Sequence, residues 1–481
     1  MTTSFAASLR QTLRLGDGMI RHSVAAALAV VLLAGCNADA LNVPNYNSVQ
    51  TTTTPDIALV QNLATGILIN ERGNIGTFYN DAGVLGRESL NYFSTDGRTV
   101  TNYLTSAALD NAGFASGGWN FRFTNMRNAI NFINIVDGAA FLTATQKSAA
   151  KGFAKTFRAL EVLYLLSTRD SLGIPVELDL ATNTAKPFVS RDSAYKFGLA
   201  LLNEAATDLA GGGGAFPFTL PSGFAPFNTP TNFIKLNRAF AGRYNVYYAT
   251  LGGGTAAWNA ALTALNASFI NSAAGADLKV GAYWNYSSSA GDALNPISNP
   301  TAPDQVAHPS IVTDAQTNGS VTDLRVAAKT TTIPSKSAPG AVAALSIPTT
   351  VGWKLYPTNT TSIPIIRNEE LILLRAEANI GLGNLGAALT DINFVRVNSG
   401  GLAPLGAFAD ANAAITAVLY EKRYSLLWEG SRWVDVRRYG RLNTLPLDLP
   451  SHFRIKVEPV PQAECLYRST QDASLKGAGC P

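Results

Sequence analysis

The chain has 481 residues, a formal net charge of +4 at pH 7 and only 15% charged side chains, whereas 47% are hydrophobic. It carries no basic run or stripe, so nucleic acid is not expected as a partner. After residue 35, no apolar stretch in the sequence approaches the roughly 20 residues that a membrane-spanning helix needs.

The first segment has the pattern of an export signal. Arg21 precedes an unbroken apolar run from Val24 to Leu33, which is too short to span a bilayer. The run ends in Leu33-Ala34-Gly35-Cys36, which resembles a bacterial lipobox. That resemblance implies cleavage before Cys36 and acylation of its thiol and amine, and more than one acyl chain is what stable anchoring requires. Residues 1–35 are therefore predicted to be a lipoprotein signal peptide, for which Met19 would be a more compact start.

The mature chain is predicted to begin with a tether and to continue as one helical domain. Residues 36–55 are polar and contain Pro44 and a run of threonines, as expected of an extended linker. Residues 56–481 are predicted to form a single domain, because apolar residues recur in them at helical spacing. In chain order the predicted helices cover residues 119–136, 153–164, 194–209 with Ser190 as the cap, 240–251, 258–265, 371–382, 385–395 and 415–427.

Two pairs of these predicted helices look alike, one at residues 382–389 and, more loosely, one with Leu251-Gly252 followed by Ala260-Ala261-Leu262. Leu382-Gly383-Asn384-Leu385-Gly386-Ala387-Ala388-Leu389 has a helix end, a tight turn and small residues that open the next helix. This pattern is similar to the tetratricopeptide helix hairpin, in which small residues let two helices approach closely. The fold class is therefore predicted to be mainly α, with tetratricopeptide-like hairpins and minor β; an unrelated helical bundle is the alternative. Residues 211–230 and 283–348 are predicted loop insertions, of a length that is usually functional or disordered.

The cysteines follow from the predicted export. With Cys36 acylated, Cys465 and Cys480 are the two that remain, and an oxidising compartment favours their pairing. A disulfide is therefore predicted between them, and two free thiols are the alternative. Their spacing does not match a CxxC metal or redox motif.

A charged stretch near the C-terminus could be mistaken for an active site. It contains Glu421, Arg423, Glu429, Arg432, Asp435 and Arg437. These residues lie beside Leu and Trp residues on a predicted helix, and Arg–carboxylate pairs suit bidentate, partly buried bridges. We therefore interpret the stretch as a structural charge network rather than as ligand contacts.

No catalytic or metal-binding motif was found. The sequence has no HExxH, no GxSxG elbow and no Gly-Lys-Ser/Thr phosphate loop. The mature part keeps two distant histidines, His308 and His452, without paired metal-ligand spacing. The sequence therefore predicts no enzyme activity, no cofactor and no metal.

Several segments resemble the SusD/RagB family. Ile365–Ala378 looks like its signature helix, Leu389–Arg396 resembles its "ALxxINxVR" helix, and Glu421–Gly440 resembles its "ERRxELxFEGxRWxDLRRxG" stretch, with Lys422 and Ser431 as departures. Shorter matches include Leu41–Asn45, Gly173–Val176, Asp323–Arg325 and Pro459–Gln462.

The resemblance implies a function. It implies a non-catalytic lipoprotein on the outer face of the outer membrane, which binds an oligosaccharide or peptide nutrient and passes it to a SusC-like, TonB-dependent β-barrel. Two alternatives remain open: a helical-toroid glycoside hydrolase, which needs a pair of carboxylates flanking a cleft, and a scaffold lipoprotein that binds protein.

Ligand candidates are aromatic residues next to Asn, Asp or Arg in predicted loops, because rings stack on sugar faces while polar groups fix orientation. The first group is Tyr283, Trp284, Asn285 and Tyr286; the second is Phe78, Tyr79, Tyr92 and Arg98, and Trp353 with Tyr356 is a third. Rings that close the core under their loops are the alternative. For Trp284, truncation to Ala is expected to weaken ligand binding without much loss of thermal stability.

Overall fold

A computed structural model describes residues 55–113, 115–182 and 184–480. The predicted signal peptide, Cys36 and most of the predicted tether lie outside these residues. Residues 54–481 form one compact unit by their internal contacts. The first half of that unit is helical: α2 (Ile57–Leu85), α3 (Arg98–Thr101), α4 (Ala115–Gly138), α5 (Ala144–Arg169), α6 (Arg191–Ala210), α7 (Pro230–Tyr248) and α8 (Gly254–Asn266).

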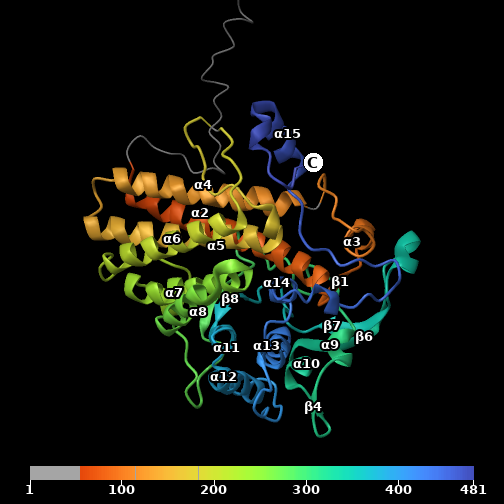
Figure 1. Ribbon diagram of the computed structural model, residues 1–481. Helices are drawn as coiled ribbons and strands as arrows, with labels where there is room; N and C mark the ends of the chain where they lie inside the picture. Colours follow the sequence, from red (N-terminus) through yellow and green to blue (C-terminus); the bar gives the residue numbers. More distant parts are fainter. Residues whose placement is uncertain (1–54, 114, 183, 481) are drawn as a thin grey trace, which may run out of the picture. The chain divides into compact units, whose positions relative to one another are not determined.

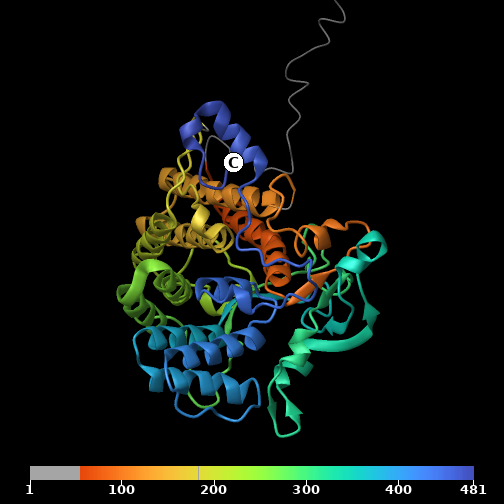
Figure 2. The same cartoon turned by 45° about the vertical axis from the view of Figure 1, so that its right-hand side comes forward.

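Neighbouring helices of this half pack against one another in chain order. α4 lies on α5, α5 on α6, α6 on α7 and α7 on α8, and α2 packs on α4. Figures 1 and 2 show these helices as successive layers, which α11 (Asn368–Gly381), α12 (Leu385–Asn398) and α13 (Ala411–Ser425) continue. The chain thus has the predicted helix-hairpin stack. α14 (Ser431–Arg438) packs against α13 and α2, and α15 (Gln462–Gln471) lies beside α4.

Short strands and helices fill the segment between α8 and α11. In the described residues the strands form four two-stranded antiparallel sheets, β1 with β3, β2 with β8, β4 with β5 and β6 with β7. Figures 1 and 2 both show β4 to β7 beside the helical layers. The bounds are β1 (Ser89–Asn91), β2 (Gly281–Trp284), β3 (Gln305–Ala307), α9 (Ser310–Thr313), β4 (Thr317–Asn318), β5 (Val321–Thr322), α10 (Leu324–Lys329), β6 (Thr330–Lys336), β7 (Thr349–Trp353) and β8 (Ile363–Arg367).

Local sequence explains several helix ends. Ser190 caps α6 by accepting a hydrogen bond from the Ser193 amide, as predicted. Thr143 and Gln146 form a capping box at the start of α5. The turn at residues 252–254 has Gly252 at φ 132° and Gly254 at φ 55°, a conformation that only glycine adopts without strain.

Helix α2 was not among the predicted helices. Its sequence contains Gly66, Gly73, Gly76 and Gly83, and glycine lowers helix propensity. Close packing explains the last of these: a Cβ on Gly83 would lie 2.6 Å from Cδ1 of Trp428. Tertiary contacts therefore override the local preference of this segment.

The loop insertion at residues 211–230 closes the core. Phe216, Phe218, Phe224 and Phe227 are all buried, and the first three pack against Phe153 or Phe157 of α5. Burying such rings stabilises a core by roughly 1.5–3 kcal/mol per side chain. This segment thus anchors to the packed interior through its phenylalanine rings, while other residues of it are exposed.

None of the helices in the described part of the chain is long and apolar enough to cross a bilayer.

Candidate functional site

A well-formed groove lies between α2, the segment before Ser222 and the end of β2. Its volume is about 420 Å³, within the range of roughly 300–1,000 Å³ that is usual for ligand pockets. Three of the predicted ligand residues, Tyr283, Trp284 and Asn285, line it. The other lining residues are Gln61, Thr65, Leu68, Ile69, Arg72, Thr219, Leu220, Pro221 and Asp292.

An ion pair crosses the groove between α2 and the segment after β2. Arg72 Nη2 lies 2.5 Å from Asp292 Oδ1, and Arg72 Nη1 donates a hydrogen bond of 2.9 Å to the Asn285 carbonyl. The Asp292 carboxylate also accepts from Ser287 Oγ at 2.7 Å. The hydrogen bond from Ser287, followed by those from Ala293 and Arg72, lowers the pKa of Asp292. The carboxylate is therefore ionised at neutral pH.

Amide side chains fix the two walls of the groove. Gln61 Oε1 accepts from the Thr219 amide at 2.8 Å, and Gln61 Nε2 donates to the Thr219 carbonyl at 3.2 Å. Asn285 Nδ2 donates to Ser222 Oγ at 2.8 Å, and its Oδ1 accepts from Ser362 at 2.8 Å. The groove is therefore held open by bonds between its own walls, so little ordering is needed when a ligand enters.

Strand β2 presents two aromatic rings in different ways. Tyr283 is half-buried, and its hydroxyl donates to the Lys279 carbonyl. Trp284 is 2% exposed and packs against Phe157 and Phe224, with ring centroids 6.2 and 5.4 Å apart. Tyr283 is therefore the more accessible of the two lining aromatic residues, whereas Trp284 is mainly a core residue behind the groove.

Four further predicted ligand residues, Phe78, Tyr79, Tyr92 and Tyr286, do not line the groove. Phe78 and Tyr79 are within α2, and Tyr79, Tyr92 and Tyr286 are buried. Each of these three tyrosine hydroxyls donates to a backbone carbonyl, at Pro364, Ile347 and Arg72 respectively. The rings of these three tyrosines close the core, which is the alternative drawn from the sequence, and they do not line the groove.

The remaining predicted ligand residues lie away from the groove lining. The side chain of Arg98 is 63% exposed at the start of α3 and pairs with Asp96 at 2.8 Å. Trp353 and Tyr356 are 2% exposed and pack near Trp428, on which Trp353 stacks at 4.6 Å. Neither set contributes to the lining of the groove.

Sequence reasoning did not identify Gln61, Arg72 or Asp292. Gln61, Thr65 and Ile69 are spaced four residues apart on one face of α2, and this face would have been a signal had the helix been predicted. Asp292 lies in a polar loop without a distinctive pattern. Only the tertiary fold brings these residues together.

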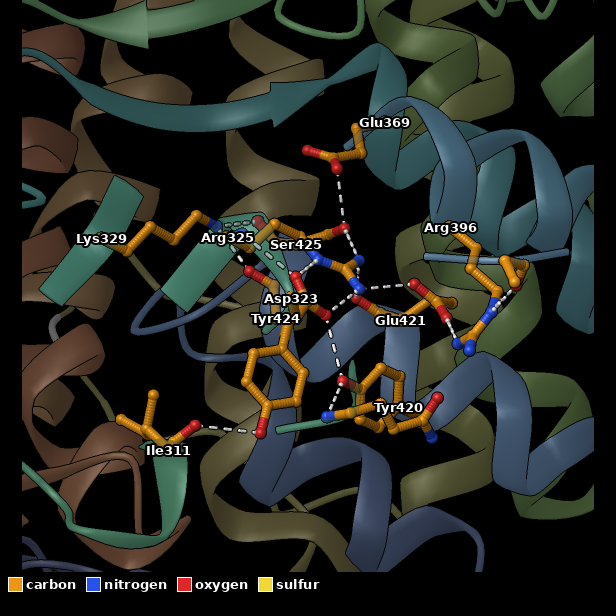
Figure 3. Close-up of polar contacts among 12 residues, drawn as sticks. Ile311, Asp323, Arg325, Lys329, Glu369, Arg396, Tyr420, Glu421, Tyr424 and Ser425 are labelled. Carbon is orange, nitrogen blue, oxygen red and sulfur yellow. Dashed lines mark hydrogen bonds and ion pairs between the residues drawn. The ribbon is translucent and has the colours of Figure 1, made fainter. Parts of the chain in front are cut away.

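The charged stretch Glu421–Gly440 forms buried bridges (Figure 3). Arg325 lies between Asp323 and Glu421, at 2.6 and 2.7 Å, and Arg396 binds the second oxygen of Glu421 at 2.9 Å. These side chains are 0–8% exposed. Arg325 also donates to Ser425 Oγ at 2.9 Å. The group joins α10, α12 and α13 and has no accessible surface for a ligand.

A second buried group joins α11, α13 and α14. Lys422 lies 2.8 Å from Glu377 and 2.9 Å from Asp435, and Arg438 bridges the same two carboxylates. Burial alone would raise the pKa of Glu377, but the charges of Arg438 and Lys422 outweigh it and lower this pKa to about 2. Lys422, a departure from the family pattern, is therefore an integral member of the group.

The other members of the charged stretch dock neighbouring segments. Arg423 binds Asp314 at 2.8 Å, Glu429 binds Arg367 at 2.5 Å, Arg432 donates to the Gly86 carbonyl and Arg437 to the Ser167 carbonyl. The hollow beside Glu429 has a volume of only about 30 Å³, far below the roughly 300–1,000 Å³ of usual ligand pockets. A sugar does not fit there.

One buried contact resembles the hydrogen-bond chain of a nucleophilic hydroxyl. His308 Nδ1 lies 2.9 Å from Ser310 Oγ, and its Nε2 lies 3.0 Å from Asp448. However, Ser310 Oγ also accepts from Arg423 at 2.7 Å, and Ser310 and His308 are at most 9% exposed. This chain of contacts therefore ties α9 to the Asp448 segment and does not present a nucleophile.

Cys465 and Cys480 form a disulfide with a Cα–Cα distance of 5.3 Å, which fastens α15 to the segment that follows it. Cys36 lies outside the described residues. Within residues 55–480, excluding 114 and 183, no group of three His, Cys, Asp or Glu side chains is placed to hold a metal ion.

Comparisons with known proteins agree with this fold. Residues 352–474 match the SusD family, and no curated protein matches the chain. The structure is similar to that of a SusD superfamily protein from Bacteroides fragilis, with 14% sequence identity, a TM-score of 0.63 and 89% of this chain and 99% of that chain covered. The predicted SusD/RagB resemblance and the mainly helical, tetratricopeptide-like fold are therefore confirmed.

Two further structures extend the comparison. NanU from B. fragilis has 14% identity and a TM-score of 0.59, with 90% of this chain and 100% of that chain covered. Surface glycan-binding protein A from Bacteroides thetaiotaomicron, in complex with laminarihexaose, has 11% identity and a TM-score of 0.60, with 87% of this chain and 99% of that chain covered.

Proposed function

From the SusD-like fold and the SusD-family sequence of residues 352–474, we propose that this protein is a surface-exposed outer-membrane lipoprotein that binds an oligosaccharide. Acylation of Cys36 anchors it in the membrane, and the protein passes its ligand to a SusC-like, TonB-dependent β-barrel. It binds the ligand and does not cleave it.

The groove beside Tyr283 is the observation that carries this proposal. It combines apolar surface from Ile69, Pro221 and Tyr283 with the polar groups of Gln61 and Asn285. Sugars have flat apolar faces and many hydroxyls, and this combination of surfaces suits both. Surface glycan-binding protein A, which was solved with laminarihexaose and has a similar fold, supports a glycan over other ligand classes.

The composition of the groove argues against hydrolysis. Glycosidases use two carboxylates about 5–10 Å apart, and Asp292 is the single carboxylate among the described residues that line the groove. That carboxylate is engaged by Arg72 at 2.5 Å. The lining therefore supports binding without cleavage.

A binding screen tests the proposal. The chain from Asn37 onward is applied to a glycan array and to a peptide library, and reducing-sugar release is assayed on every glycan that binds. We expect binding to glycans without turnover. Binding to peptides alone, or release of reducing sugar, would overturn the glycan-binder assignment.

Two tyrosine variants locate the site. Tyr283→Ala removes an aromatic lining residue of the groove, whereas Tyr467→Ala removes a ring of α15 that is 43% exposed, in a separate hollow of about 210 Å³. We expect Tyr283→Ala to weaken glycan binding about tenfold, since stacking is worth roughly 1–3 kcal/mol per ring for planar ligands. Tyr467→Ala should bind as the parent does, and the reverse result would move the site to the second hollow.

The membrane part of the proposal needs its own test. Mass spectrometry of the protein from native membranes should find acyl chains on Cys36, and Cys36→Ala should release the protein from the outer-membrane fraction. Copurification of the wild-type protein with a TonB-dependent barrel should follow. An unmodified Cys36 thiol would contradict the anchor, and a wild-type protein without a barrel would contradict delivery.

A further inference from the structure

The groove contains one positive and one negative charge, and each neutralises the other. Of the twelve described residues that line it, Arg72 and Asp292 are the two that carry charge. Their side chains are 14% and 30% exposed, so both are partly accessible from the groove. At a separation of 2.5 Å such a pair presents almost no net charge to a ligand.

The guanidinium of Arg72 is fixed by several partners. Nη2 is engaged by Asp292, Nη1 donates to the Asn285 carbonyl, and the guanidinium carbon lies 5.4 Å from the centre of the Tyr286 ring. Asp292 in turn accepts from Ser287 and from the Ala293 amide. A ligand carboxylate would have to displace Asp292 from Arg72 while lying beside its negative charge.

The second hollow of the protein carries more charged side chains than the groove does. That hollow lies between α4, residues 175–186 and α15. Six charged residues line it, three basic and three acidic: Arg127, Lys186, Arg468, Glu177, Asp179 and Glu464. The remaining groove surface beside Tyr283 is apolar or uncharged, and Ile69 is 50% exposed there.

We propose, on the basis of the proposed glycan-binding function, that the groove takes an uncharged glycan segment and that Asp292 determines this selectivity. By occupying Arg72, Asp292 removes the one cation that an acidic sugar could bind and adds a negative charge that repels it. Uncharged sugars accept and donate hydrogen bonds at the groove without disturbing the pair.

An array that contains both kinds of glycan tests this inference. Neutral and acidic members are matched in backbone and length, such as mannohexaose with hexamannuronate and methyl-esterified with de-esterified oligogalacturonates; laminarihexaose is added as a further neutral probe. We expect the wild-type chain from Asn37 onward to bind neutral members and to bind their acidic counterparts at least about tenfold more weakly. Tenfold corresponds to about 1.4 kcal/mol, within the range for a hydrogen bond involving a charged group.

The variant Asp292→Asn provides the decisive measurement. It leaves Arg72 without its carboxylate, so we expect the ratio of acidic-glycan to neutral-glycan affinity to rise about tenfold. Asp304→Asn is the control. The side chain of Asp304 is 29% exposed, close to the 30% of Asp292, and forms an ion pair with Lys336, which is 31% exposed. Asp304 does not line the groove. Asp304→Asn should leave the affinities for neutral and for acidic glycans unchanged. Thermal unfolding should show that Asp292→Asn and Asp304→Asn both fold.

The outcomes separate the two proposals. Wild-type binding of acidic glycans as strongly as neutral ones would overturn the selectivity and leave the glycan-binding function in place. The same holds if Asp292→Asn gains nothing for acidic members, or if Asp304→Asn gains as much. A wild-type chain that binds no glycan of either kind would overturn both.

Discussion

The groove beside Tyr283 and the buried groups of the Glu421–Gly440 stretch both consist of charged and aromatic residues, but they differ in accessibility. In the buried groups, carboxylates such as Glu421 and Glu377 are 0% exposed and meet two cations each. In the groove, a single ion pair with Arg72 14% and Asp292 30% exposed lies among uncharged walls. The most distinctive sequence motif of the chain is therefore structural, whereas the candidate binding site is formed by segments without a motif.

The largest loss of unfolding free energy should come from Arg325→Ala. This change leaves the carboxylates of Asp323 and Glu421 without the guanidinium that lies 2.6 and 2.7 Å away. Breaking a buried pair in this way costs about 3–5 kcal/mol of unfolding free energy, measurable by urea denaturation. Asp304→Ala removes a partly exposed pair and should cost less than about 1 kcal/mol. Equal losses in the two variants would remove the distinction between buried and exposed charges.

Trp284→Ala should cost about 3 kcal/mol, because it leaves a cavity in the core. This expectation differs from the one drawn from the sequence, in which the substitution weakens binding with little loss of stability; the 2% exposure of Trp284 and its contacts with Phe157 and Phe224 explain the change. Comparing the melting temperatures of Trp284→Ala and Tyr283→Ala tests this expected loss of stability. If Trp284→Ala keeps its melting temperature and loses only glycan binding, the ring belongs to the groove.

Two buried carboxylates should respond oppositely to pH. Burial raises the pKa of Glu88 to about 8 despite the nearby charges of Arg432 and Arg423, whereas Arg438 and Lys422 overcome burial and lower that of Glu377 to about 2. The pKa of Glu88 is higher in the folded than in the unfolded protein. Its contribution to the unfolding free energy is therefore present below a pH of about 4.5 and is lost as the pH rises through about 8. Stability from Glu377 is present above about 4.5 and is lost as the pH falls towards 2.

Glutamine variants measure this difference. We expect Glu88→Gln to raise the unfolding free energy at pH 9 by about 1–2 kcal/mol and to change it little at pH 4.5. Glu377→Gln should be destabilised at pH 7, and its deficit should shrink as the pH falls from about 4.5 towards 2. Denaturation curves at several pH values provide the test, and a parallel pH dependence of the two variants would refute the assignment.

The smallest effect is expected for Arg98→Ala. Arg98 is 63% exposed, pairs with Asp96 at the start of α3 and does not line the groove. We therefore expect no change in melting temperature or glycan affinity, measured side by side with Tyr283→Ala. A loss of glycan binding would show that the ligand surface reaches α3.

Local patterns predicted much of the fold. Ser190 marked the start of α6, and the small residues after Gly383 marked the turn between α11 and α12, because capping and close helix approach are decided by nearby residues. Helix α2 was missed because its glycines lower the local signal while packing partners such as Trp428 lie far along the chain.

The candidate site was predicted only in part for the same reason. Tyr283 and Asn285 were found because an aromatic residue beside an amide is visible in the sequence, and both line the groove. Arg72 and Asp292 are 220 positions apart in the numbering, and no local pattern relates them. The aromatic signal also selected Tyr79 and Tyr92, since the sequence does not distinguish a ring at a ligand from a ring in the core.

Helix α2 serves the groove through Gln61 and Arg72 and the core through Gly83, beside Trp428. One turn contains 3.6 residues, so inserting a single residue between positions 72 and 83 would rotate one end against the other by about 100°. Either the groove residues would then turn away from Asp292, or a side chain would strike Trp428. The rotation of α2 about its own axis therefore affects both ligand binding and folding. We expect related proteins to show no insertion or deletion in the second half of this helix.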